Sequence, residues 1–160
     1  MTGTVTAALI AATLSLHPVN SKLKGNDLYC LSTVVYMEAR GEDKRTQISV
    51  AHVPITRAKA KREMGMKTNI CSVVTKSGQF PWARNRRALK QRFDKQAWEK
   101  SVRLAADVLN NKIKDPTRGA THFCHVTEVK KVSWCQGKKA HRLTTGGLRF
   151  IYLNESPLLY

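Results

Sequence analysis

Glu38 is the residue of this chain whose position best suits acid–base chemistry. It lies in the segment YMEARGE (36–42), at the C-terminal end of a mostly apolar stretch. A carboxyl there would be partly desolvated, which raises its pKa and suits it to act as a general acid. The alternative is a surface carboxylate paired with Arg40 or Arg45, and residue types alone favour that alternative.

The chain carries a large excess of positive charge. Its 160 residues include 28 lysine and arginine residues against 11 aspartate and glutamate residues, a formal net charge of +17 at pH 7. With 42% hydrophobic residues, this length fits one folded domain and excludes both a multidomain enzyme and a wholly disordered protein. The charge predicts an anionic partner, and composition leaves open whether that is nucleic acid, lipid phosphate or cell wall.

Three amphipathic segments predict three helices, and the first of them carries Glu38. The first runs over 26–40 and begins at a capping residue. Asp43 caps a second helix, whose apolar stripe contains Pro54, so we expect that helix to kink or split there. Asp94 caps the third helix, which ends at an asparagine pair.

The rest of the chain predicts loops and a small sheet. Residues 64–93 combine glycine, proline and a basic run, which is typical of irregular, surface-facing segments. Residues 121–123, 132–134 and 148–152 are short β-prone runs separated by polar turns, and they predict a small antiparallel ribbon. The expected fold class is therefore α+β and mainly helical.

Four cysteines leave the redox state of the chain open. If the first two long helices are antiparallel, Cys30 lies near Cys71, while Cys124 and Cys135 could face each other across the ribbon. We favour these two disulfides, and four buried free thiols are the alternative. A zinc site in the C-terminal region is a further alternative, although the ligand spacing is irregular. Its residues would be His122, Cys124, His125, Cys135 and His141.

The first 21 residues carry no charged side chain. The apolar stretch 4–16 would be about 20 Å long as a helix, which is too short to span a bilayer. It resembles the apolar core of a secretion signal but lacks a basic start and an obvious A-x-A cleavage site. We therefore treat residues 1–25 as an N-terminal apolar segment, either a packing helix or an export-type signal, and residues 26–160 as one domain.

Several separate blocks, in order along the chain, carry a resemblance to a known family. They are YMEARGE (36–42), Gln47 with Val50-Ala51, TNICSVV (68–74), QFPW (79–82), DPTRGATHF (115–123) and Ser133-Trp134. Over about residues 28–152 the chain resembles the SleB-type cell wall hydrolases, and several blocks are far stronger evidence than one motif. That family includes spore-cortex-lytic enzymes and phage or bacterial lysins. The resemblance implies a small lysozyme-like or lytic-transglycosylase-like catalytic domain, residues 26–160, that cuts the glycan strand of peptidoglycan.

The resemblance also implies which acid is catalytic. In the family it is the first glutamate of the E-A-R-G-E motif, which maps onto Glu38, whereas Glu42 has no such role. The family is associated with lytic transglycosylation, in which one acid suffices and the muramic 6-hydroxyl captures the anomeric carbon to give a 1,6-anhydro product. Ordinary glycosidases need a second carboxylate about 5 to 9.5 Å away, and the sequence offers no clear candidate. A hydrolytic muramidase of the same fold is the alternative.

A glycan groove is a further implication of the resemblance. Sugar rings present apolar C–H faces to aromatic side chains and hydroxyls to amide, hydroxyl or imidazole groups. For Phe80, Phe123 and Trp134, packing in the core is an equal alternative, and His122 could instead satisfy a buried carbonyl. The expected groove residues are Gln79, Phe80, Trp82, Thr121, His122, Phe123 and Trp134.

Three places depart from the family pattern. Pro54 and Thr56 stand where the second helix usually continues to Asn-Arg. Pro81 replaces the small polar residue usual between the two aromatic residues of QFPW, and Leu148 stands where a histidine is usual. The closing strand is therefore the part of the chain that follows the family least closely.

A basic nucleic-acid-binding module is the alternative from a different class. Basic residues in two stretches could track phosphates, with Trp82 and Phe93 near enough in sequence to interleave. No helix-turn-helix, zinc-finger or RNP signature accompanies them, and a lysin has its own use for positive charge on an anionic envelope. The basic residues are Arg84, Arg86, Arg87, Lys90, Arg92, Lys130, Lys131, Lys138, Lys139 and Arg142.

The expected partners are thus peptidoglycan glycan strands and anionic envelope polymers, with virion association left open and no specific nucleic acid. No cofactor and no metal is implied. A compact basic domain suits a phage endolysin or virion-borne lysin that acts in the periplasm at the cell wall, whether delivered by phage or exported. A bacterial envelope-remodelling enzyme is the alternative.

Overall fold

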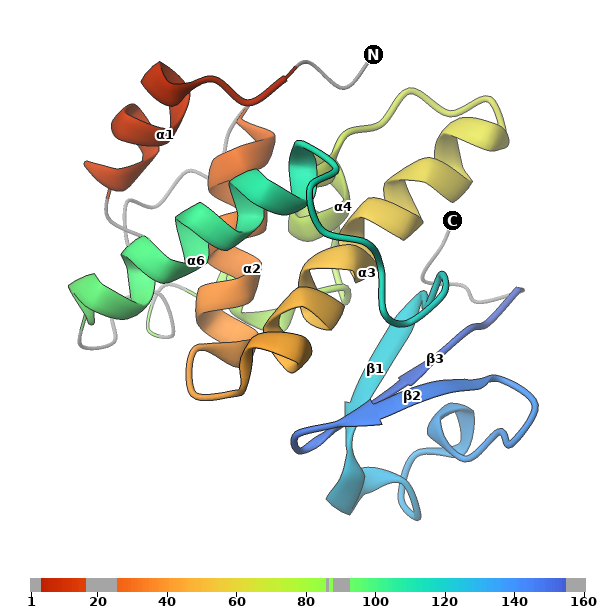
Figure 1. The fold of residues 1–160 in the computed structure, drawn as a ribbon. Helices are drawn as coiled ribbons and strands as arrows, with labels where there is room; N and C mark the ends of the chain where they lie inside the picture. The colour runs from red at the N-terminus through yellow and green to blue at the C-terminus, as the bar shows by residue number, and fades with distance from the viewer. Residues whose placement is uncertain (1–3, 17–25, 86, 88–92, 155–160) are drawn as a thin grey trace.

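A computed structural model describes residues 4–16, 26–85, 87 and 93–154. The helices pack together, and a three-stranded sheet lies to one side of them, next to α3 (Figure 1). The helices are α1 (Ala7–Leu14), α2 (Asp27–Ala39), α3 (Lys44–Glu63), α4 (Ile70–Thr75) and α6 (Lys95–Leu109). The strands are β1 (His122–His125), β2 (His141–Thr145) and β3 (Leu148–Ile151), and the 3-10 turns are η1 (Pro81–Arg84), η2 (Val126–Glu128) and η3 (Ser133–Cys135). The predicted α+β, mainly helical class is confirmed.

Helix α2 is the central element of the core. Helices α1, α3, α4 and α6 all pack against it, and ten of its thirteen residues are buried. Tyr29 and Tyr36 of α2 each meet Trp98 of α6 edge-on, with ring centroids 5.9 Å apart. The last turn of α2, which carries Glu38, is therefore held by packing along most of the helix.

The three long helices begin where the sequence predicts. The side-chain oxygens of Asn26, Asp43 and Asp94 each accept a backbone N–H of the first turn at 2.9 Å. Helix α3 runs unbroken through Pro54, so of the two expected effects of this residue, a kink or a split, the split is wrong. Pro54 is buried, and because its ring removes only one backbone hydrogen bond, packing of α3 in the core can preserve the helix.

Part of the segment predicted to be an irregular loop is helical. Helix α4 lies within it, begins at the cap Asn69 and buries four apolar residues, packing against α2 and α3. The prediction of a surface-facing segment is therefore wrong for α4, because six residues are too few to show a helical period. Of the basic run, residues 86 and 88–92 lie outside the described part of the chain.

The sheet is antiparallel with strand order β1-β3-β2, so β3 is central. The turn Gly146-Gly147 joins β2 to β3, and Gly146 adopts φ +54°, as tight hairpin turns require. The prediction of a strand at 132–134 is wrong, because this stretch enters the 3-10 turn η3. The second neighbour of β3 is instead β2, whose largely exposed HRLTT sequence lacks the apolar alternation of a half-buried strand.

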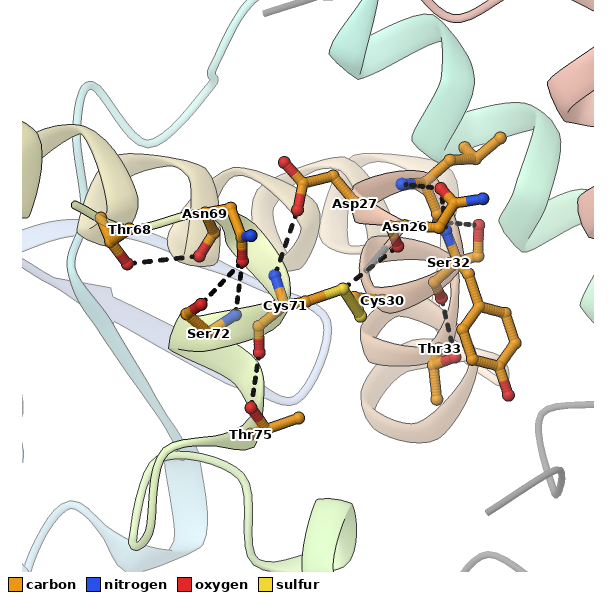
Figure 2. Close-up of a disulfide and its surroundings, with 12 residues drawn as sticks. Asn26, Asp27, Cys30, Ser32, Thr33, Thr68, Asn69, Cys71, Ser72 and Thr75 are labelled. Carbon is orange, nitrogen blue, oxygen red and sulfur yellow. Dashed lines mark hydrogen bonds between the residues drawn. A yellow bond between two sulfur atoms is a disulfide. The ribbon is translucent and has the colours of Figure 1, made fainter. Parts of the chain in front are cut away.

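Two disulfides join the predicted cysteine pairs. Cys30–Cys71 links α2 to α4, and Cys124–Cys135 links β1 to η3. Figure 2 shows the first of them, where the Asp27 carboxylate also accepts the backbone N–H of Cys71 at 3.2 Å. Both pairings are confirmed and the alternative of four free thiols is wrong. The expected geometry of the second pair is wrong, since Cys135 comes from a 3-10 turn rather than a strand.

The N-terminal apolar segment is helical between Ala7 and Leu14. Helix α1 packs on α6 and α2, and Asn110 exchanges two hydrogen bonds with the backbone of Val5, at 2.8 and 3.1 Å. This arrangement fits the packing-helix alternative, while the export-signal alternative stays a prediction. Within the described residues, no helix combines the length and the apolar character needed to cross a membrane.

Candidate active site

Glu38 lies in the last turn of α2 and is half-buried. Its Oε1 accepts a hydrogen bond from the indole Nε1 of Trp82 at 2.6 Å. Burial raises the pKa of Glu38 above its ordinary value, while the Trp82 hydrogen bond and the positive charge of Arg57 act in the opposite direction. The guanidinium of neighbouring Arg40 lies over the Tyr36 ring, 4.9 Å from its centroid. Glu38 thus has the raised pKa and the fixed orientation that a general acid needs.

Arg57 of α3 is the residue that connects the parts of the site. Its side chain is only 4% exposed, and it donates from Nε to the Thr121 carbonyl and from Nη1 to Gln79 Oε1, both at 2.6 Å. Its guanidinium lies 5.5 Å from the Phe80 ring centroid. Burial lowers the pKa of Arg57 to about 10, and the charge of Glu38 opposes this shift. Arg57 remains a cation at neutral pH and stabilises the ionised form of Glu38.

The sequence analysis did not single out Arg57 as a site residue. A signal was present, because Arg57 follows Val50 and Val53 at the i, i+3, i+7 spacing of one helix face. Both valines are fully buried. A cation in register with a buried apolar face must have partners in the interior, since an isolated buried charge is strongly unfavourable. The spacing of Arg57 from these two valines therefore indicates that its side chain lies inside the fold.

The block QFPW brings three of the expected residues against Glu38 and Arg57. Gln79, Phe80 and Trp82 are all buried, and the Phe80 and Trp82 rings contact each other with centroids 5.8 Å apart. Both rings belong to the hydrophobic core. Trp82 therefore holds the Glu38 carboxyl from the core, and Phe80 packs against Trp82 and Arg57.

The segment at the start of β1 adds a second set of expected residues. Thr121 Oγ1 lies 2.8 Å from His122 Nδ1 and accepts the Leu153 N–H at 2.9 Å. His122 is 1% exposed, and burial, together with the positive charge of Arg57, lowers its pKa to about 3. The imidazole is therefore neutral across the physiological range. Its ring lies 5.6 Å from that of Trp134, which is 38% exposed.

Phe123 is not among the residues that meet around Glu38 and Arg57 in these contacts. It follows His122 on a strand, so its side chain leaves the opposite face of β1. Its ring packs against Phe150 of β3, with centroids 5.7 Å apart. The contacts place Phe123 within the sheet packing, whereas Trp134 is the expected aromatic with the most accessible ring.

Glu42, the second glutamate of the motif, belongs to the α2–α3 loop, and its carboxylate lies against the tip of the β2–β3 hairpin. A methyl group added to Gly146 would meet the Glu42 carboxylate, and one added to Gly147 would come within 2.9 Å of His125 Nε2. Thr46, one turn into α3, hydrogen bonds to Thr145 across the same junction at 3.0 Å. Glu42 thus lies where the α2–α3 loop meets the sheet, a different environment from that of Glu38.

Replacing Trp82 with phenylalanine is expected to move the pH dependence of activity. The substitution keeps a ring in the core but removes the N–H that stabilises the Glu38 carboxylate, so the pKa of Glu38 rises further. A reaction that needs protonated Glu38 then keeps its activity to higher pH, and the alkaline limb of kcat/KM against pH shifts upward. A pH–rate profile of wild type and Trp82→Phe measures this shift.

Trp98→Phe is the matched control for this substitution. Trp98 is also a core tryptophan, but its indole N–H has no hydrogen-bond partner among the described residues. Its replacement should lower stability without moving the alkaline limb. Equal shifts in the two variants would show that the Trp82 hydrogen bond does not set the pKa of Glu38.

The raised pKa of Glu38 also predicts how stability depends on pH. Between the unfolded and the folded pKa the native protein holds a proton that the unfolded chain has lost, so the free energy of unfolding falls as pH rises through this window. Glu38→Gln removes the ionisation but keeps an oxygen for Trp82. Thermal unfolding should therefore show a higher Tm for Glu38→Gln at pH 7, with the difference vanishing below the ordinary pKa of glutamate. A constant difference at every pH would contradict this account.

The zinc alternative loses two of its ligands to a covalent bond. Cys124 and Cys135 are joined to each other, and a disulfide sulfur is not the thiolate that zinc requires. Across the described residues, no group of three or more His, Cys, Asp or Glu side chains is placed to hold a metal ion. The chemistry of the site is therefore derived from Glu38 and the groups around it.

Comparison with known proteins agrees with this geometry. A family model described as Cell Wall Hydrolase matches residues 41–151, which include Arg57, the QFPW block and the β1 segment but begin three residues after Glu38. No curated protein and no solved structure matches the chain. The resemblance seen in the sequence blocks is thereby confirmed over more than half of the chain. This chain belongs to the Cell Wall Hydrolase family, whose members degrade peptidoglycan.

Proposed function

We propose that the protein cleaves the glycan bond between N-acetylmuramic acid and N-acetylglucosamine by lytic transglycosylation, with Glu38 as the acid and base. The proposal rests on a half-buried carboxyl with a raised pKa at the position where the family motif has its catalytic glutamate. A protonated carboxyl at neutral pH is what the first step of glycosidic cleavage requires.

Each step can be assigned to Glu38. Its proton goes to the glycosidic oxygen as the bond between that oxygen and the muramic C1 breaks. The resulting carboxylate then accepts the proton of the muramic 6-hydroxyl while O6 forms a bond to C1. The products are a free N-acetylglucosamine hydroxyl and a 1,6-anhydro-muramic end, and Glu38 returns to its protonated form. No external nucleophile and no second acid is needed.

The surroundings of Glu38 are the observation that carries this mechanism. Within the described residues, the groups that shift its pKa are Trp82 and Arg57, and no carboxylate is among them. A retaining glycosidase needs a partner carboxyl about 5 to 5.5 Å away, and an inverting one about 6.5 to 9.5 Å away. A carboxylate at the shorter of these distances would itself raise the pKa of Glu38. This argues against a retaining muramidase with a second carboxylate close to Glu38, and it supports the single-acid route.

The other residues of the site hold Glu38 and line the approach to it. Trp82 and Arg57 limit how far its pKa rises and fix its orientation. In the proposal, the exposed ring of Trp134 is the platform for a sugar face. Gln79, Thr121 and His122 are buried and support the site through their hydrogen bonds to Arg57 and to each other. Phe80 and Phe123 have structural roles.

The disulfides and the charge support a proposed place of action. Two disulfides suit an oxidising compartment such as the periplasm, and the formal charge of +17 favours association with anionic wall polymers. We extend the proposal to a phage endolysin or virion-borne lysin acting on the wall. Detection of the protein in purified virions would support the virion-borne form, and its absence there would leave the endolysin and the bacterial enzyme.

Mass spectrometry of the products released from purified peptidoglycan tests the reaction. Muropeptides with a 1,6-anhydro end are expected, each 18 Da lighter than the corresponding hydrolysis product because no water is added. Products with a reducing muramic end would establish hydrolysis and overturn the single-acid mechanism. If no sugar were released while the protein bound nucleic acid, the basic binding-module alternative would replace the enzyme.

A further inference from the structure

Three cationic side chains gather beside the candidate site, and we call Arg57, Lys61 and Lys76 the cationic cluster. Arg57 and Lys61 stand four residues apart on one face of α3, and both are buried, Lys61 with only 7% of its surface exposed. Lys76 follows α4, is half-buried, and accepts the backbone N–H of Gln79 at its carbonyl, 3.2 Å away. Two packed helices therefore bring these charges together.

The cationic cluster has little anionic compensation. Burial and the positive charges of Lys76 and Arg57 lower the pKa of Lys61, so the cations repel one another. The ion pairs found in the described part of the chain are Lys59–Glu63 and Lys112–Asp107, and neither includes a member of the cluster. The acid coupled to Arg57 is Glu38. Grouping buried like charges in this way is unfavourable unless an anion joins them.

During catalysis the negative charge of Glu38, which offsets the charge of Arg57, is lost. Glu38 must be protonated, and so uncharged, at the moment it acts as an acid, which leaves Arg57 and both lysines without a charged partner among the residues that the structure describes. A substrate anion bound at this moment would be attracted by all three cations in a partly desolvated setting, where charge interactions are strong. Such an anion would lie near Gln79, whose side chain accepts from the Arg57 guanidinium at 2.6 Å and whose backbone N–H donates to the Lys76 carbonyl at 3.2 Å.

We propose that Arg57, Lys61 and Lys76 form a carboxylate-binding subsite that takes an acid group of the muramic residue next to the cleaved bond. This inference rests on the proposed function, because it assumes a peptidoglycan strand in the site. Two carboxylates fit the chemistry: a free carboxylate of the stem peptide, and the lactyl carboxylate of a muramic residue whose stem has been removed. Either would make the enzyme prefer acid-bearing strands to neutral ones.

The experiment measures binding in the Glu38→Gln background, so that the strands are not consumed. Lys61→Met and Lys76→Met each remove one charge while keeping an unbranched side chain to fill the same space. Lys59→Met is the matched control, because it removes one charge from the same helix at a side chain that is 72% exposed. Thermal unfolding of each variant verifies that it is folded, and Lys76→Met serves if burial makes Lys61→Met unstable.

The ligands are soluble glycan strands with intact stems, the same strands with their carboxylates converted to amides, and strands stripped of stems by an amidase. If the stem peptide supplies the carboxylate, Lys61→Met and Lys76→Met should each raise Kd for intact strands about tenfold, the size of one lost hydrogen bond to a charged group, and Lys59→Met should not. Amidation should weaken binding by a similar factor and abolish the difference between the variants and their parent.

The stripped strands identify the source of the carboxylate. A loss of affinity on intact strands that disappears on stripped strands assigns the subsite to the stem peptide, and a loss that appears only on stripped strands assigns it to the lactyl carboxylate, which is free only there. The subsite is refuted if the lysine variants lose the same affinity for amidated, intact and stripped strands, or if Lys59→Met matches them. Failure of wild type to release sugar from any strand would instead overturn the proposed function, and binding reports on the subsite separately.

Discussion

Glu38→Gln is expected to lower the rate of peptidoglycan cleavage by roughly 10³-fold or more, because the amide can neither donate nor accept the transferred proton. The same carboxyl serves both steps of the proposed mechanism, so no second group can take over half of its work. Gln retains an oxygen where Trp82 donates, and the fold should survive. Initial rates of release of anhydro-muropeptides from purified peptidoglycan, with KM determined separately, measure the effect.

Glu42→Gln is the control for that experiment, since it makes the same chemical change four residues away. The Glu42 carboxylate lies against the β2–β3 hairpin, so its loss should affect how the sheet is held and leave most of kcat intact. Activity near the wild-type level in both variants would remove Glu38 from its assigned role. A loss with Glu42→Gln as large as that with Glu38→Gln would show that Glu42 takes part in the reaction.

The second large effect concerns the disulfide Cys30–Cys71. Removing it in the double variant Cys30→Ala/Cys71→Ala should lower the free energy of unfolding by about 4 kcal/mol, because the bond closes a chain separation of 41 residues in the unfolded state. For a domain of this size the expected fall in Tm is roughly 10 °C. The disulfide joins α4 to the start of α2, and Glu38 lies at the other end of that helix. Cleavage at low temperature should therefore remain close to wild type.

The two single substitutions provide the control for this prediction. Cys30→Ala and Cys71→Ala each break the same bond, so each alone should lower stability nearly as much as the double variant does. Urea unfolding of the three variants, with wild type measured before and after thiol reduction, gives the comparison. If the two single effects added up to the double effect, the loss would come from side-chain packing at each cysteine and not from the covalent link.

The chain itself contains enough local information to specify its main helices. The caps Asn26, Asp43 and Asp94 were identified from residue type and position because a capping hydrogen bond involves only residues within one turn. The motif that contains Glu38 and the family blocks are likewise contiguous in sequence. Both disulfide pairs followed from placing two helices antiparallel and from the expectation of a ribbon.

Short elements with weak local signals were predicted less well. Helix α4 has six residues, and β2 is largely polar and exposed, so neither shows the periodicity on which prediction depends. At 132–134 the β-prone residues Val132 and Trp134 suggested a strand, but the chain forms a 3-10 turn there whose Cys135 is bonded to β1. Tertiary packing overrides propensity in segments this short.

The sequence by itself determined the three long helices and the family, favoured the two cysteine pairs and pointed to the acid that we assign. Only the tertiary structure decided which groups surround that acid. Trp82 donates to Glu38 across 44 residues of chain, and Arg57 donates to Thr121 across 64. The pKa of Glu38 depends on burial and on such contacts. Because burial and contacts between distant segments exist only once the helices and the sheet have packed together, no local pattern in the sequence contains them.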